Sequence, residues 1–316
     1  MQQTLRRCRH SPTVEARRAW RELLITTPGL SDSISGVILY DETIRQQTTA
    51  GTAFLDVLSD AGILAGIKVD TGTTPLAGHP GEKVTEGLDG LRQRLSDYAS
   101  LGARFVKWRA VFTVADGLPT GACLTANAGA LARYASLCQE AGLVPVVEPE
   151  VLMAGRHTLT DCAAATGRVL QAVFEQLTDQ DVLLEGMLLK PNMVLPGRDA
   201  ERHGQDSVDE VAQATLTCLL RNVPAAVPGI VFLSGGQPPA DASERLNAMN
   251  IPHRTAPLPW AVSFSFGRAI QQPALHTWKG QQGHFAAAQR ELAHRATCNA
   301  AARRGEYTAT LEQVAA

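Results

Sequence analysis

The stretch Val146-Val147-Glu148-Pro149-Glu150 decides the fold, because it joins an apolar run to two carboxylates in alternating positions. Side chains alternate between the two faces of a strand, so Glu148 and Glu150 lie on the same face. Burying a charge is costly unless the charge finds polar partners or a partly wet pocket. The stretch therefore predicts the carboxyl end of a buried strand that supplies charged groups to a shared site.

The same pattern occurs in the apolar runs on both sides of this stretch. Lys68 and Asp70 end the run at 63–70, Lys107 and Arg109 share a face in the run at 103–112, and Lys190 ends the run at 182–190. These charged positions recur roughly every 40 residues, a length that fits one strand followed by one helix. Buried strands that alternate with helices favour a parallel sheet, with the site at the carboxyl ends of its strands.

Seven strands are expected, with helices between them. The strands are expected at 36–40, 63–70, 103–112, 143–150, 182–190, 229–235 and 260–267. Amphipathic stretches predict helices at 84–101, 126–141, 162–177, 208–221 and 240–248. Because eight strand–helix units close a TIM (β/α)8 barrel, the sequence predicts an α/β barrel whose first strand is missing or incomplete. We expect an atypical leader at 1–12, a single barrel domain at 13–305 and a C-terminal tail at 306–316.

The composition is that of an ordinary globular protein, with 45% hydrophobic and 19% charged residues. It permits a large core and argues against intrinsic disorder. The formal net charge of -2 argues against a nucleic-acid surface, and no apolar run reaches the roughly 18 residues of a membrane span. The cysteines form no close pairs and the histidines form no metal-binding motif. We therefore expect reduced thiols, a cytoplasmic location, no metal, and neither nucleic acid nor membrane as a partner.

Lys190 and Glu148 are candidates for imine chemistry. A lysine attacks a carbonyl only as the neutral amine, and an apolar wall together with the nearby Lys107 disfavours the charged form of Lys190. Glu148, on the neighbouring strand, is placed to move the protons of imine formation. A purely structural pair of lysine and carboxylate is the alternative, and these residues alone leave it open.

The last two strands end in residues suited to binding phosphate. Ser234, Gly235 and Gly236 end one strand, and Ser265, Gly267 and Arg268 end or follow the next. Glycine amides can approach a phosphate closely, and a guanidinium can pair with it. Phosphate sites after the seventh and eighth strands are common in barrels of this kind. We therefore expect the carbonyl substrate to be a sugar phosphate.

The chain resembles class I fructose-bisphosphate aldolases over about residues 13–307. The stretches that carry the resemblance are 35–39, Gly66-Ile67-Lys68-Val69-Asp70, Lys107-Trp108-Arg109, Val147-Glu148-Pro149-Glu150, Leu189-Lys190-Pro191-Asn192-Met193 and Leu233-Ser234-Gly235-Gly236-Gln237. The resemblance implies a TIM barrel that cleaves fructose 1,6-bisphosphate reversibly to dihydroxyacetone phosphate and glyceraldehyde 3-phosphate in glycolysis and gluconeogenesis. It also implies a lysine Schiff base, no metal or cofactor, and a possible homotetramer.

The resemblance assigns roles to individual residues. It implies that Lys190 forms the imine, that Glu148 relays protons and that Lys107 is an electrostatic partner. Ser234, Gly235 and Arg268 would hold one phosphate, Lys68 and Arg109 would lie toward the other, and Asp70, Gly236, Ser265 and Gly267 would complete the substrate contacts.

The chain departs from the family at its start. The family carries a catalytic aspartate in a Leu-Ala-Ala-Asp-Glu-Ser stretch on its first strand, where this chain has Leu5-Arg6-Arg7-Cys8-Arg9-His10-Ser11. Imine formation is then expected to remain possible, and carbon–carbon cleavage to be slow. A gene start placed too late, or a frameshift, is favoured over a real loss of cleavage. The alternative functions are a barrel that binds sugar phosphates or protein partners without turnover, and a lysine-imine lyase with another acceptor aldehyde.

Overall fold

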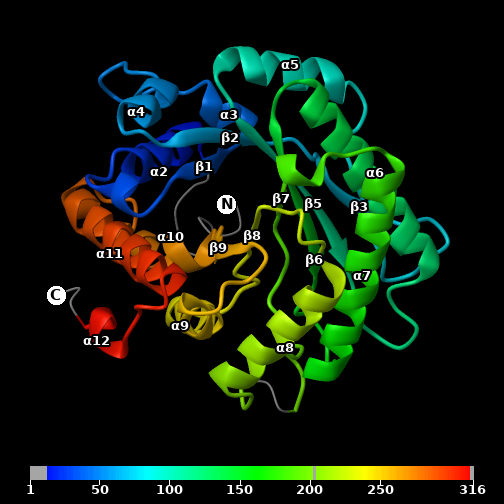
Figure 1. Cartoon of the computed structure of the whole chain (residues 1–316). Helices are drawn as coiled ribbons and strands as arrows, with labels where there is room; N and C mark the ends of the chain where they lie inside the picture. The colour runs from blue at the N-terminus through cyan, green and yellow to red at the C-terminus, as the bar shows by residue number, and fades with distance from the viewer. Residues whose placement is uncertain (1–12, 202–203, 314–316) are drawn as a thin grey trace.

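The computed structural model describes residues 13–201 and 204–313 (Figure 1). The expected leader at 1–12, the place of the missing first strand and the first-strand position of the family's aspartate lie outside the described residues. Thr13 is the first described residue, and its side-chain oxygen accepts a hydrogen bond from the Ala16 N–H and caps the first described helix.

The described residues form a curled central sheet of seven parallel strands. In spatial order these are β1 (Gly36–Leu39), β2 (Leu64–Lys68), β5 (Phe105–Phe112), β6 (Val144–Val151), β7 (Leu188–Leu189), β8 (Gly229–Phe232) and β9 (Ala261–Phe264). Every neighbouring pair is parallel. The expected α/β fold of barrel type with seven strands is confirmed.

Helices surround the sheet and form an outer ring (Figure 1). The helices are α2 (Val14–Ile25), α3 (Asp41–Ile44), α4 (Phe54–Asp60), α5 (Leu91–Leu101), α6 (Gly121–Glu140), α7 (Leu159–Asp179), α8 (Val208–Asn222), α9 (Pro239–Asn250), α10 (Arg268–Trp278), α11 (Phe285–Arg303) and α12 (Ala309–Glu312). An antiparallel hairpin of β3 (Gly72–Pro75) and β4 (Lys83–Glu86) lies outside the main sheet. No described helix is long and apolar enough to cross a membrane.

Two of the sequence expectations differ most from the structure in their bounds. The helix expected at 84–101 begins only at Leu91, because residues 83–86 form the second strand of the β3–β4 hairpin. The strand expected at 182–190 consists of Leu188–Leu189 alone, since a 3₁₀ turn at Leu184–Gly186 precedes it. Lys190 therefore lies just beyond a very short strand.

Side-chain packing fixes the central strands next to each other. Tyr134 on α6 is fully buried, and its hydroxyl donates to the Val106 carbonyl at 2.6 Å and lies 3.2 Å from the Val146 carbonyl. Its ring lies against Trp108, with 5.6 Å between the ring centroids. Because β5 carries Lys107 and β6 carries Glu148, this packing also fixes the bases of two candidate site residues.

In the outer ring α2, the first described helix, packs beside α10 and α11 from the C-terminal part of the chain (Figure 1). Trp20 of α2 stacks on Trp278 of α10, with 5.3 Å between the ring centroids. The Gln289 amide on α11 lies 3.2 Å from the Leu23 carbonyl and 3.1 Å from the Thr26 hydroxyl. The helical ring is therefore closed at this point, whereas in the described sheet β1 pairs only with β2 and β9 only with β8.

Replacing Trp20 by alanine is expected to lower the free energy of unfolding by about 3 kcal/mol, because the ring is 2% exposed and its loss leaves a void against Trp278. Chemical denaturation followed by circular dichroism measures the change. Val14→Ala on the same helix is the matched control, since Val14 is 60% exposed and should change stability by at most about 0.5 kcal/mol. Equal losses in both variants would contradict the role given to the tryptophan pair.

Candidate active site

A cavity of about 1070 Å³ occupies the inside of the ring of strands. Six of the predicted site residues line it: Lys68, Lys107, Lys190, Ser265, Gly267 and Arg268. The other predicted residues, Asp70, Arg109, Glu148, Ser234, Gly235 and Gly236, are not among its lining residues. The structure thus places the candidate lysines in the cavity wall and Glu148 behind them.

Glu148 bridges the two central lysines. Its Oε1 lies 3.2 Å from the Lys190 Nζ, and its Oε2 lies 2.9 Å from the Lys107 Nζ. All three side chains are at most 9% exposed. The structure therefore brings together the amine, the carboxylate and the second cation that alternation along the strands had predicted.

Backbone and side-chain hydrogen bonds fix this cluster at the carboxyl ends of the strands. The Lys190 N–H donates to the Val147 carbonyl at 2.8 Å, which continues the β6–β7 pairing past the short strand. Asn192 then accepts a hydrogen bond from the Val151 N–H at 2.9 Å through its side-chain oxygen. The chain on both sides of Lys190 is thus fixed to β6, the strand that carries Glu148.

The environment of Lys190 favours its neutral form. Burial lowers the pKa of the Lys190 amine, and repulsion by Lys107 lowers it further, whereas Glu148 acts in the opposite direction. The net result is a pKa below the ordinary value for lysine. A larger fraction of the amine is therefore uncharged at neutral pH than in an exposed lysine, which is the condition for attack on a carbonyl.

Glu148 and Lys107 are both favoured in their charged forms. Burial raises the pKa of Glu148, but the attraction of Lys107 and Lys190 outweighs it and leaves the pKa below its usual value. Burial lowers the pKa of Lys107, and the attraction of Glu148 and Asp70 reverses this effect, so the net shift is upward. The cluster therefore holds one carboxylate and one ammonium beside an amine that tends to be neutral.

The rate at which a ketose phosphate forms an adduct with Lys190 is expected to rise with pH with a midpoint below 10.5, because only the neutral amine attacks and burial lowers its pKa from that value. The measurement is the rate of borohydride-trapped adduct, followed by mass spectrometry at a series of pH values. A midpoint at or above 10.5 would show that Lys190 titrates as an ordinary lysine.

Three other predicted residues form an adjoining charge network. Lys68 Nζ lies 2.6 Å from Asp70 Oδ1, and Asp70 Oδ2 lies 3.7 Å from the Lys107 Nζ. Asp70 Oδ2 also accepts a hydrogen bond from the Arg109 N–H at 3.2 Å. The Arg109 guanidinium is paired with Glu150 at 2.5 Å. Lys68 is therefore the member of this network that faces the cavity, and Asp70 links it to Lys107.

The glycines after β8 have backbone conformations that other residues adopt only with strain. Gly235 has φ 58° and Gly236 has φ 96°. A Cβ on Gly235 would lie 2.8 Å from the Met153 Sδ, and one on Gly236 would lie 3.4 Å from the Arg268 guanidinium. The turn therefore brings backbone close to Arg268, which is the first residue of α10. Backbone N–H groups, a guanidinium and a helix N-terminus at one place suit a phosphate.

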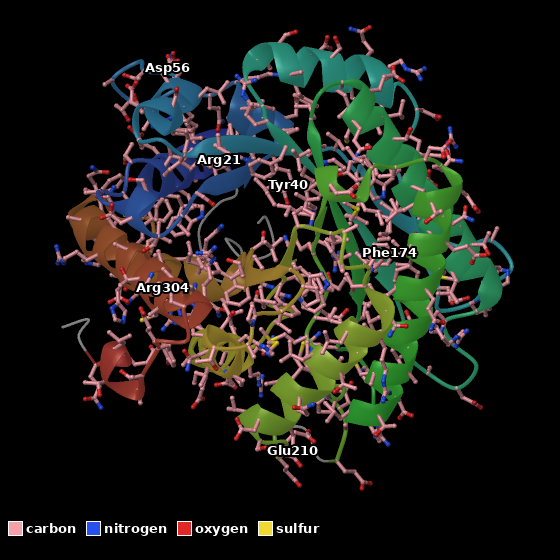
Figure 2. All side chains as sticks on the ribbon, viewed as in Figure 1. Arg21, Tyr40, Asp56, Phe174, Glu210 and Arg304 are labelled. Atoms are coloured by element: carbon pink, nitrogen blue, oxygen red, sulfur yellow. The ribbon has the colours of Figure 1, made fainter. Side chains whose placement is uncertain are left out.

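Tyr40 is a site residue that the sequence did not indicate. It follows β1 and lines the cavity, and the Lys68 Nζ lies 5.8 Å from its ring centroid. Figure 2 shows Tyr40 inside the ring of helices, whereas Asp56 and Glu210 lie on its outer rim. A single aromatic residue after a strand does not by itself predict a binding site. The position of Tyr40 in the cavity wall follows only from the curvature of the sheet.

One group of side chains outside the cavity has the composition of a metal site. His294, Cys298 and Glu312 place one potential ligand atom each within 4.8 Å of one another. However, the Arg295 guanidinium lies 2.5 Å from one Glu312 oxygen, and the Tyr307 hydroxyl donates to the other at 2.5 Å. The carboxylate is thus already neutralised. These bonds also attach the expected tail at 306–316 to α11 as far as it is described.

The sequence of this chain is similar to those of known aldolases. The family model "Glycolytic: Fructose-bisphosphate aldolase class-I" matches residues 1–316. The chain belongs to the class I fructose-bisphosphate aldolase family. A "Probable fructose-bisphosphate aldolase class 1" of Xylella fastidiosa is 56% identical over 294 residues, which cover 93% of this chain and 86% of the relative. "Fructose-bisphosphate aldolase 6, cytosolic" of Arabidopsis thaliana is 51% identical over 291 residues, covering 92% and 80%.

A solved structure supports the same aldolase fold. The structure described as "Ternary co-crystal structure of fructose-bisphosphate aldolase from Plasmodium falciparum in complex with TRAP and a small molecule inhibitor" matches with a TM-score of 0.94 and 43% identity, covering 97% of this chain and 88% of that one. Aldolases are lyases, so the expected enzyme class is confirmed. The comparisons do not favour the alternative of a barrel that binds ligands without turnover.

Proposed function

We propose that this aldolase cleaves fructose 1,6-bisphosphate reversibly through an imine on Lys190, with Glu148 as the proton relay and Lys107 as its electrostatic partner. The observation that carries this assignment is the position of Glu148 between the two buried lysines, 3.2 Å from one and 2.9 Å from the other. The same cluster adjoins a cavity large enough for a sugar bisphosphate.

Glu148 is proposed to move the protons of imine formation. The neutral Lys190 amine attacks the ketose carbonyl at C2, and Glu148, at 3.2 Å, accepts the proton that the nitrogen must lose. Glu148 passes this proton to the oxygen, which gives the carbinolamine hydroxyl. A second proton, taken up from solvent through Glu148, lets that hydroxyl leave as water and yields the iminium ion. Lys107, at 2.9 Å, keeps Glu148 ionised and ready to accept again.

The iminium ion draws electrons from the C3–C4 bond, which breaks to give an aldehyde and an enamine on Lys190. Protonation of the enamine at C3 and hydrolysis of the imine release dihydroxyacetone phosphate. The C4 hydroxyl must also lose a proton during cleavage. The resemblance gives this task to a first-strand aspartate that residues 1–12 do not supply, so we propose that cleavage is slower than imine formation.

The phosphates are proposed to bind at two places in the wall. Ser265, Gly267 and Arg268 line the cavity after β9, next to the glycine turn at Gly235 and Gly236. Lys68 lines it on the other side. We also propose a cytoplasmic location, in agreement with the name of the cytosolic relative from Arabidopsis thaliana.

The proposal is tested by two assays on the full chain. Incubation with dihydroxyacetone phosphate followed by borohydride is expected to give a covalent adduct that peptide mapping places on Lys190. Fructose 1,6-bisphosphate is expected to yield triose phosphates in a coupled assay. A trapped adduct without cleavage of this substrate would be followed by a panel of ketose phosphates. Cleavage of another member would indicate another acceptor aldehyde, and cleavage of none would indicate that the cleavage step is lost. The absence of any adduct would overturn the proposal.

A further inference from the structure

A second, smaller cavity adjoins the turn that residues 234–237 form after β8. Its volume is about 250 Å³, and Gly236, Gln237 and Arg245 of α9 are among the residues that line it. A Cβ on Gly236 would also lie 3.4 Å from the guanidinium of Arg268, which lines the central cavity. The 234–237 turn therefore lies between the small cavity and one wall of the central cavity.

The backbone of the 234–237 turn does not by itself hold a single shape. The Gln237 N–H donates to the Ser234 carbonyl at 2.9 Å and closes the turn. Gly235 and Gly236, which lie between them at positive φ, have no side chains to restrict their backbone. Gly236 also lines the small cavity, so packing does not support this side of the turn. The side-chain bonds of Gln237 therefore matter for the shape of the turn.

Arg245 holds the side chain of Gln237 in place. The Arg245 Nη1 donates to the Gln237 Oε1 at 2.7 Å, and the Gln237 Nε2 lies 3.6 Å from the Sδ of Met193. Gln237 itself is buried. These two contacts attach the end of the turn to α9 on one side and, on the other, to the segment that follows Lys190.

The position of Arg245 is unfavourable for a charged side chain. Its side chain is 11% exposed, and among the described residues its one hydrogen bond goes to Gln237. The buried Nε has no partner in the part of the chain that the structure describes, and Asp241 Oδ2 is 3.9 Å from Nη2, too far for a hydrogen bond. A buried charge with so few partners costs stability. This cost favours a role of Arg245 in function over a role in stability.

We propose that Arg245 is a positioning residue for the phosphate site, an inference that rests on the function proposed above. Through Gln237 it holds the 234–237 turn in the shape that presents backbone N–H groups to a substrate phosphate beside Arg268. Arg245 is not among the residues that line the central cavity, so it acts through the turn and not by contact with substrate. Because the turn is ordered before the phosphate arrives, binding does not have to order it.

The test measures the binding of a hexitol 1,6-bisphosphate to the full chain by isothermal titration calorimetry. This probe has no carbonyl, so it cannot form an imine. Arg245→Met keeps an apolar side chain of similar length without the donor, and the Kd is expected to rise by about tenfold. Borohydride trapping of unphosphorylated dihydroxyacetone is expected at the wild-type rate, because that reaction involves no phosphate. Arg92→Met is the matched control, since it removes an exposed arginine paired with Glu140 and should leave the Kd unchanged.

A second variant, Gln237→Met, removes the acceptor while Arg245 stays in place. The Kd is again expected to rise by about tenfold. The double variant should bind no more weakly than the weaker of the two single variants, because both changes break the same hydrogen bond. Circular dichroism checks the fold of each protein, and Gln237→Met tests the same bond if Arg245→Met does not fold.

Four results would overturn the inference. One is an unchanged Kd in folded Arg245→Met. Another is a double variant in which the two losses add, because Arg245 would then act by a route other than Gln237. A third is an equal loss in the trapping of unphosphorylated dihydroxyacetone, which would indicate a general disturbance of the site. The last is a wild-type chain that does not bind the bisphosphate, whereas binding without any imine adduct would overturn only the imine chemistry proposed above.

Discussion

Replacing Lys190 by alanine is expected to abolish the borohydride-trapped adduct with dihydroxyacetone phosphate and to lower kcat for fructose 1,6-bisphosphate by about 10⁴-fold or more. The reason is that the amine is the nucleophile, and no other described lysine combines contact with Glu148 with a lowered pKa. Lys107 is the nearest competitor, but its pKa is raised, so it stays charged and cannot attack. Mass spectrometry of the trapped protein and a coupled cleavage assay measure the two effects.

The control for this experiment is Lys83→Ala. Lys83 lies on β4 with an exposed side chain and does not line the cavity, so its loss should leave both the adduct and kcat unchanged. The Lys190→Ala protein is expected to keep its fold, because Lys107 remains as a counter-ion for the buried Glu148 carboxylate. Circular dichroism checks this. An adduct that persists in a folded Lys190→Ala protein would mean that another lysine forms the imine.

Alternation along the strands made the centre of the site predictable from the sequence. Glu148 and Lys107 lie on adjacent strands, and Lys190 follows the next strand, so their side chains had to converge once the strands were parallel. The physical basis is simple, because a charge on a buried strand is tolerated only next to opposite charge or water. In the structure the opposite charge is present, because the Glu148 carboxylate lies between the Lys107 and Lys190 amines.

The sequence was less informative about positions that depend on the curvature of the sheet or on which side chains pair across its strands. Arg109 was expected to lie toward a phosphate, but its guanidinium is paired with Glu150 and it is not among the cavity-lining residues. Tyr40 shows the opposite case, since it lines the cavity without any sequence signal. Which face of a strand is buried follows from alternation, whereas which charges pair across strands depends on register and on side-chain reach.

The hairpin at 72–86 was missed for a related reason. Its strands place Thr73, Thr74 and Pro75 opposite Thr85, Val84 and Lys83, with no run of apolar residues to distinguish them from a loop. The apolar periodicity that begins near Val84 continues into α5, so the two elements were merged into one expected helix. Gly87 and Gly90, both with positive φ, separate them in the structure.

Replacing Glu148 by glutamine is expected to lower kcat by about 10²- to 10⁴-fold while the trapped adduct on Lys190 still forms at long times. Glutamine keeps the shape of the side chain but cannot carry the proton between the attacking nitrogen and the leaving hydroxyl. It also removes the negative charge between Lys107 and Lys190, so their mutual repulsion lowers the pKa of Lys190 further. The amine becomes more available just as the proton relay is lost.

These two effects can be separated by following the adduct over time at several pH values. A slower approach to the same final amount of adduct, with a midpoint shifted to lower pH, would identify Glu148 as the proton relay. Glu140→Gln is the matched control, because Glu140 forms an exposed pair with Arg92 and should change neither quantity. If the adduct instead forms at the wild-type rate, the protons of imine formation move through water, and the buried carboxylate serves only to hold the two lysines 2.9 and 3.2 Å from its oxygens.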